Sequence, residues 1–185
     1  FGGHLTANVN AQQGRVGRVE AIGRFVPNNS WVGGSIRGKI AAGQNIVSVK
    51  AYKGDINLTS GRSVRAGTGI QSILALDGSI TGDGNDATKE VVVSNGNLGS
   101  LKAERGNING VAVDVNGSQG EGTGRINYVA ATQSSEGITD SLFEADGRLE
   151  FLQSTGRWNS DEGGLMGGNL RGTSVDAGQL GRIVV

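Results

Sequence analysis

Hydrophobic residues recur along the chain in a short frame: any residue, an aliphatic one, two of any kind, a second aliphatic one, another residue, and a small or branched one. The seven copies of this aliphatic frame begin at Arg15, Asn45, Gly69, Asn97, Arg125, Arg148 and Gln179. They are 30, 24, 28, 28, 23 and 31 residues apart, and such periods are typical of solenoids. The pattern therefore predicts a stack of similar coils.

A second frame, the glycine frame, precedes the first in each coil and consists of glycine, one polar residue and Leu or Ile. Its copies begin at Gly3, Gly34, Gly54, Gly78, Gly106 and Gly168, with a degenerate copy at 136–138. The two aliphatic positions of the aliphatic frame are three steps apart, whereas a straight strand returns to one face only after an even number of steps. We therefore expect a corner inside that frame.

Together the two frames predict an all-β fold, a right-handed parallel β-helix of about seven coils with three short strands per coil. At about 4.8 Å per coil the rod would be roughly 34 Å long. The composition agrees, because 34 glycines suit corners, and 36% hydrophobic but only 4% aromatic residues suit a narrow core of stacked aliphatic side chains. We expect one domain over residues 1–185, with loop excursions at about 23–33, 82–90, 114–123 and 156–167.

Charge and composition exclude several classes of partner. Seventeen basic and 17 acidic residues leave no formal net charge, and no basic cluster supplies the electrostatic footprint that nucleic-acid binding needs. No apolar run is long enough to span a membrane as a helix. There are no cysteines, so disulfides say nothing of the redox compartment. Phe1 at the start favours a processed protein or a piece of a longer one.

Three segments carry a family resemblance: GGNLRGTSVDAGQLGRIVV, GNLGSLKAERGNINGVAVDVNG and GDINLTSGRSVRAGTGIQSILALDGSI. They resemble the glycine-rich right-handed β-helix repeats of bacterial secreted and surface proteins, including filamentous-haemagglutinin-like adhesins and planctomycete-type solenoids. The resemblance covers nearly the whole chain, but its motifs are generic to β-helices. It implies an extracellular or cell-surface, structural or adhesive role, and it carries over no catalytic residue.

Candidate catalytic chemistry is sparse. The only histidine is His4, which leaves no histidine-based triad or multi-histidine metal site. Four acids gather in the sixth coil, at Asp140, Glu144, Asp146 and Glu150. Glycosidase chemistry needs two carboxylates about 5 to 10 Å apart across one cleft, and no pattern places two of these so. We therefore predict a non-enzymatic protein without catalytic, cofactor-binding or metal residues, and keep a polysaccharide-active enzyme as a remote alternative.

Two polar excursions contain possible oxygen ligands. They hold Asp83, Asn85 and Asp86 in 82–90, and Asn116 and Glu121 in 114–123. We interpret them as solvated turns, since Gly, Asn and Asp are ordinary turn formers. A calcium site stays open as an alternative, since hard cations take several oxygen ligands.

The two ends of the chain match each other. The first and last frame copies, GRVGRVEA at 14–21 and GQLGRIVV at 178–185, share two glycines, one arginine and both aliphatic positions, and from Gly168 to Gly3 of a following molecule the count is 20 residues, as from Gly34 to Gly54. Because open β edges are templates for pairing, we expect a head-to-tail homopolymer or a tandem array, with a capped or trimeric unit as the alternative. The expected end-to-end interface comprises Phe1, Leu5, Val16, Arg18, Val19, Leu180, Arg182, Ile183 and Val185.

Two excursions carry the aromatic residues Phe25, Trp31 and Trp158, and both leave after the aliphatic frame and before the glycine frame. Tryptophan is favoured at interfaces, so this corner is a candidate for lateral or glycan contact. The alternative is a loop folded over its own solenoid, which we favour for Trp31, with display for Trp158. We predict a stacking extracellular structural protein, and an adhesin or carbohydrate-binding module as the alternative.

Overall fold

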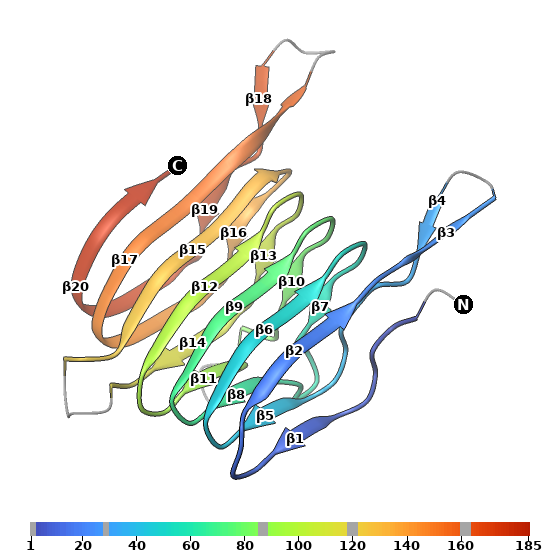
Figure 1. The fold of residues 1–185 in the computed structure, drawn as a ribbon. Coiled ribbons are helices and arrows are strands. Elements are labelled where there is room, and N and C mark those ends of the chain that lie inside the picture. Colours follow the sequence, from blue (N-terminus) through green and yellow to red (C-terminus); the bar gives the residue numbers. More distant parts are fainter. Residues whose placement is uncertain (1–2, 28–29, 85–88, 118–121, 160–163) are drawn as a thin grey trace.

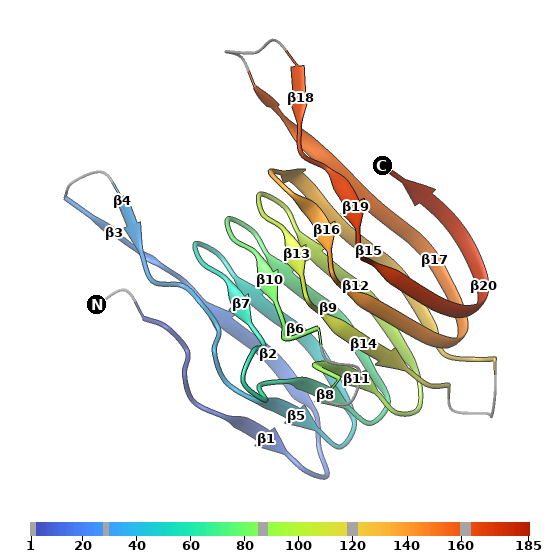
Figure 2. The ribbon, with the colours of Figure 1, turned by 180° about the vertical axis from the view of Figure 1, so that it is seen from behind.

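The structure is a computed structural model that describes residues 3–27, 30–84, 89–117, 122–159 and 164–185. These residues form a β-solenoid with three faces and contain no helix (Figures 1 and 2). Strands of successive coils pair in parallel on every face. The predicted fold class is thus confirmed.

The glycine frames build the first face. Leu5 and Ile36 start it as single β-bridges. Its strands are β7 (Ile56–Asn57), β10 (Ile80–Thr81), β13 (Ile108–Asn109), β16 (Gly137–Thr139) and β19 (Asn169–Arg171). From Leu5 to Leu170 this ladder has seven rungs, so the chain completes about six turns between them.

The second face comes from short strands that lie between the two frames. They are β1 (Val9–Ala11), β5 (Ile40–Ala42), β8 (Val64–Ala66), β11 (Val91–Val93) and β14 (Ala112–Val115). The first parts of β17 (Leu142–Asn159) and β20 (Ser174–Val184) continue this ladder.

The aliphatic frames build the third face. Its strands are β2 (Val16–Ala21), β6 (Asn45–Ala51), β9 (Gly69–Ala75), β12 (Asn97–Ala103), β15 (Arg125–Ser134) and the later parts of β17 and β20. Equivalent residues lie directly over one another, so that Val49 pairs with Ile73 and Ile73 with Leu101. All three are fully buried, as expected of inward ladders that exclude water from a continuous core.

The corner expected inside the aliphatic frame is wrong. Each copy forms one continuous strand, and the ladder between β9 and β12 passes from Leu98–Ile70 to Ser100–Ser72 without pairing the residues between them. The strand bends at this unpaired position. This kink lets the second aliphatic side chain of the frame point into the core from the same face as the first. A Cβ added at Gly99, in the kink, would collide with the Gln71 carbonyl of the preceding coil.

Two β-hairpins project from one corner of the solenoid. The first consists of β3 (Arg24–Val26) and β4 (Ser30–Val32), and the second pairs the end of β17 with β18 (Gly164–Met166). Both hairpins are antiparallel and point away from the coils (Figure 1). The prediction that both excursions leave at the same junction is confirmed.

Candidate self-association surfaces

The C-terminal end of the solenoid exposes its core. Leu180 and Ile183 of β20 are 51% and 42% exposed, whereas Leu149 and Leu152, their partners in the preceding coil, are fully buried. Val185 is exposed as well. These side chains continue the inward ladders, so this end presents apolar surface where every earlier coil presents a covered one.

The N-terminal end is different. Val16 and Val19 are only 6% exposed, although no described coil precedes them, and Leu5 is half-buried. On the third face, the inward side chains of a coil are therefore covered mainly by the coil that follows. Phe1, which belongs to the expected interface, lies outside the described residues.

Glycines of the first coil leave space on its outer side. A Cβ added at Gly78 or Gly106 would collide with a carbonyl of the preceding coil, which belongs to Gly54 or Gly78 respectively. At Gly3, the equivalent residue of the first coil, a Cβ would meet nothing within 4 Å. The first coil thus has the same glycine that inner coils need for close approach of a neighbour.

Both ends also have unpaired strand edges. Among the described residues, β1 pairs only with β5, β2 only with β6, and the strand pairing of β20 is with β17 alone. The outer side of each terminal coil therefore carries a row of backbone N–H and C=O groups that can pair with another strand.

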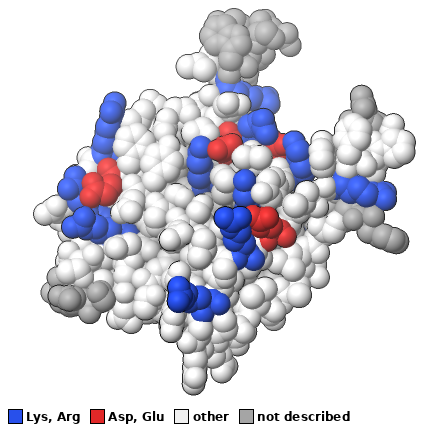
Figure 3. All heavy atoms as spheres, viewed as in Figure 1, with Lys and Arg blue, Asp and Glu red and all other residues white. Residues whose placement is uncertain are grey.

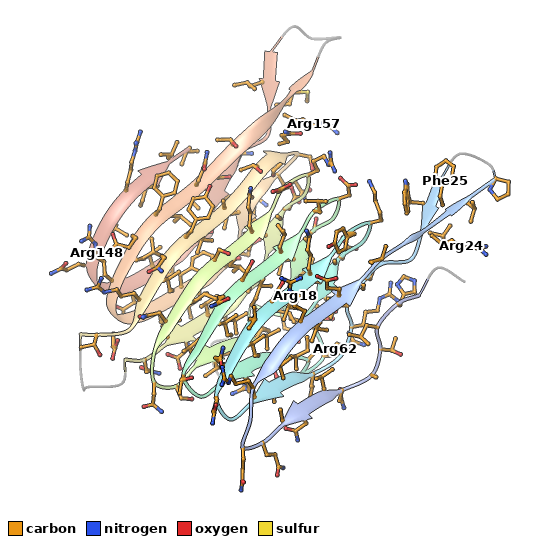
Figure 4. The ribbon with its side chains drawn as sticks, viewed as in Figure 1. Arg18, Arg24, Phe25, Arg62, Arg148 and Arg157 are labelled. Carbon is orange, nitrogen blue, oxygen red and sulfur yellow. The ribbon has the colours of Figure 1, made fainter. Side chains whose placement is uncertain are left out.

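Arginines mark the outward side of both terminal strands. Arg18 on β2 and Arg182 on β20 are exposed and occupy the same frame position (Figure 4 labels Arg18). In the two coils before that of Arg182, this position holds Tyr128 and Phe151, whose rings stack with centroids 5.3 Å apart. The Arg182 guanidinium lies 6.0 Å from the Phe151 centroid and extends that stack to the end of the rod.

A charge ladder lies at the corner after the aliphatic frames. The Asp77 carboxylate accepts a hydrogen bond from Lys53 in the preceding coil and pairs with Arg105 in the following one. Burial raises the pKa of Asp77, but the bonds from Lys53 and Arg105 outweigh it and hold that pKa below its ordinary value. On the face seen in Figure 3, charges of both signs are interspersed.

The first hairpin displays its aromatic pair. Phe25 and Trp31 are cross-strand partners in a T-shaped contact, with centroids 5.6 Å apart, and are 53% and 47% exposed. Lys53 Nζ lies 5.2 Å from the Trp31 centroid. Figure 4 shows Phe25 on the projecting hairpin. The expectation that Trp31 pins a loop onto the solenoid is wrong, because the aromatic pair stabilises a hairpin that extends outward.

The second hairpin repeats the first. Gly33 and Gly34 at the base of β4 both have positive φ, as do Gly167 and Gly168 at the base of β18. A Cβ at Gly34 would crowd the backbone nitrogen of Gly23, where the first hairpin leaves, and a Cβ at Gly168 that of Gly156, where the second leaves. The two hairpins are therefore anchored by the same close glycine contact.

The second hairpin also displays apolar surface, since Leu165 is 74% exposed. Its register partner is Trp158, for which the structure describes the strand position only. Sequence reasoning missed Leu165 as an interface candidate. The signal was present in the recurrence of Gly-Arg-aromatic at 23–25 and 156–158 and of the double glycine that follows each hairpin.

The four acids of the sixth coil are held in separate contacts. Asp146 accepts backbone hydrogen bonds from Gly117 and Gly124, Glu144 pairs with Lys89, and Glu150 with Arg148. Asp140 is at a turn with positive φ. None of these contacts joins two of the acids.

The polar excursions are described in part, because Asn85, Asp86 and Glu121 lie outside the described residues. Asp83 Oδ2 accepts a hydrogen bond from the Ser60 backbone, and Asn116 donates one to Asp114. In the described part of the chain, no group of three or more His, Cys, Asp or Glu side chains is placed to hold a metal ion.

No protein-family profile, curated protein or solved structure matches this chain. Over the described residues, there is also no helix of the length and apolarity that crossing a membrane requires.

Proposed function

We propose that this protein is a non-enzymatic structural unit that stacks end to end with further copies of itself into a fibre. The observation that carries the proposal is the exposure of Leu180 and Ile183, ladder positions that the following coil buries everywhere else. The family resemblance supports an extracellular or cell-surface setting. A contact between unlike ends is heterologous, and because the copies would stack along the solenoid axis it would produce an open fibre and not a closed ring or dimer.

The first coil of a second copy fits the open end. In register with the inner coils, Leu170 would stack on Leu5, and the ladder of Val175 and Ala177 would continue in β1 as Val9 and Ala11. On the third face, β20 would pair with β2 of the next copy.

That third-face pairing covers the exposed ladder positions. Leu180 would lie on Val16, and Ile183 on Val19, as each inner coil lies on its neighbour. We call this contact the junction. It satisfies the open strand edges of both copies and removes the apolar end from water.

The junction also brings Arg182 of one copy beside Arg18 of the next, a like-charge pair across neighbouring strands. Such pairs are destabilising, whereas opposite charges contribute roughly 0.2 to 1 kcal/mol. Arg18→Glu alone and Arg182→Glu alone should therefore each strengthen association severalfold at low salt. The double variant should return to the parent level, because it recreates a like-charge pair.

Sedimentation velocity over a concentration series measures these association constants, and negative-stain images show whether the assemblies are rods. The sign reversal in the double variant distinguishes a specific junction from a general effect of net charge. A parent protein that stays monomeric at millimolar concentration and high ionic strength would refute the proposed function.

A second candidate function is a glycan-binding surface, and the exposed Phe25–Trp31 pair is the observation that favours it. Aromatic rings offer an apolar face to a sugar ring. A change in tryptophan emission on adding oligosaccharides, lost in Trp31→Ser, would support this alternative.

A further inference from the structure

We propose that the two hairpins join across each junction into one four-stranded antiparallel sheet, in the order β17, β18, β3, β4, with β3 and β4 supplied by the next copy. This inference rests on the proposed end-to-end stacking and names a second contact between the same two molecules. Among the described residues, β3 pairs only with β4, and β18 only with β17.

The position of β18 at the end of the rod carries the argument. β20 pairs with β17 as far as Gln153, and β18 pairs with β17 from Arg157 to Asn159. Figures 1 and 2 place β18 on the edge of β17 along which β20 pairs. In Figures 1 and 2, β18 lies on the C-terminal side of β17, and β3 on the N-terminal side of its own hairpin.

The first coil has the complementary arrangement. β3 follows β2 directly, beginning three residues after Ala21. When β2 of the next copy pairs with β20, β3 of that copy comes to lie beside β18, one strand spacing of about 4.8 Å away. β17, β20 and β2 are parallel in the junction, and β18 is antiparallel to β17, so β18 and β3 meet as antiparallel strands.

The register follows from the equivalence of the two hairpins. Arg157 lies three residues after Ser154, the last position of its frame, as Arg24 lies three residues after Ala21. Arg24 of the next copy therefore lies two strands away from Arg157, in the same row across the sheet.

The strand between them is β18, in which Met166 is the register partner of Arg157, and Leu165 that of Trp158. The same register on the other edge of β18 places Met166 opposite Arg24, and Leu165 opposite Phe25 of the next copy.

This register brings exposed apolar groups together. Residues directly opposite each other in an antiparallel pair project from the same face. Leu165 would thus pack beside Phe25, which already contacts Trp31 across its own hairpin. Leu165, which is 74% exposed in the single molecule, is covered by the aromatic pair of the first hairpin, which gives both hairpins a partner of matching chemistry.

Disulfide cross-linking tests the register directly, because the chain contains no cysteine. Phe25→Cys and Leu165→Cys are made as separate variants, mixed under assembly conditions and mildly oxidised. We expect a covalent dimer in the mixture and none in either variant alone, since each junction brings together one copy of each position.

A second matched pair, Arg24→Cys with Met166→Cys, keeps the test valid if the first has the wrong geometry. Neighbouring cross-strand pairs alternate between wide and narrow Cα separations of about 5.5 and 4.5 Å, so one of the two pairs has the geometry that favours a bond. Arg24→Cys mixed with Leu165→Cys is the control, because these side chains project from opposite faces and should not cross-link.

The outcomes separate the two proposals. The joined sheet is supported if a matched pair cross-links and the control mixture of Arg24→Cys with Leu165→Cys does not. If the parent forms rods but neither matched pair cross-links, the joined sheet is refuted while stacking stands. If the parent forms no rods, stacking fails and the joined sheet fails with it. A dimer from a single variant alone would reveal a symmetric contact and overturn the joined sheet.

Discussion

Replacing Leu180 and Ile183 together by alanine should weaken end-to-end association measurably. Complete burial of such a side chain contributes about 1.5 to 3 kcal/mol. Because 51% and 42% of the two side chains are still exposed in the single molecule, burial in the junction would add about 1.4 to 2.8 kcal/mol for the pair. The dissociation constant should therefore rise by about 10- to 100-fold.

Ile73→Ala is the matched control, since Ile73 is fully buried in a central coil. It should lower the free energy of unfolding by about 2 to 5 kcal/mol and leave association of the folded protein unchanged. Sedimentation velocity gives the dissociation constant, and urea unfolding gives the stability. If the Leu180→Ala/Ile183→Ala variant associates as tightly as the parent, these side chains are not in the junction.

Two further predictions concern the coils themselves. Leu101→Asp should lower the free energy of unfolding by several kcal/mol, because it buries an unpaired charge in the core. The outward substitution Lys102→Ser should change it little. Equal stability of the two variants in a thermal or urea melt would show that the inward and outward positions of the frame are misassigned. For Asp77, whose pKa is held below its ordinary value, the stabilisation is present above the unfolded pKa of about 3.9 and is lost as the pH falls through the lower folded value. The stability difference between parent and Asp77→Asn, followed by urea unfolding from pH 7 to pH 2, should therefore shrink with acid, and a constant difference would contradict this linkage.

The ladders could be predicted from sequence because each coil repeats the same inward positions. The spacing of Val49, Ile73 and Leu101 is enough to predict one ladder, and all three are fully buried. The second face was missed because its strands are three or four residues long, and segments such as Ile40–Ala42 carry only two inward residues. The kink at Gly99 differs from the expected corner because the sequence shows that the chain must turn there but not by how much.

The ends were harder to predict. The likeness of 14–21 and 178–185 indicates that the two terminal coils are interchangeable, but it does not show that only the last one exposes the inward residues of its third face. That asymmetry depends on which neighbour covers an inward side chain, a property of the three-dimensional stack. The hairpins were assigned to the correct corner, yet their relation was missed because Leu165 has no counterpart of its own type in the first hairpin.

Because the inward side chains of the third face are covered by the following coil, a fibre of this protein would have two chemically unlike tips on that face. One tip would present Leu180 and Ile183 to water, whereas at the other Val16 and Val19 are nearly covered. Both tips would keep open strand edges. A blocking protein that resembles a first coil would stop growth at the apolar tip, and the opposite tip would need a block that resembles a last coil.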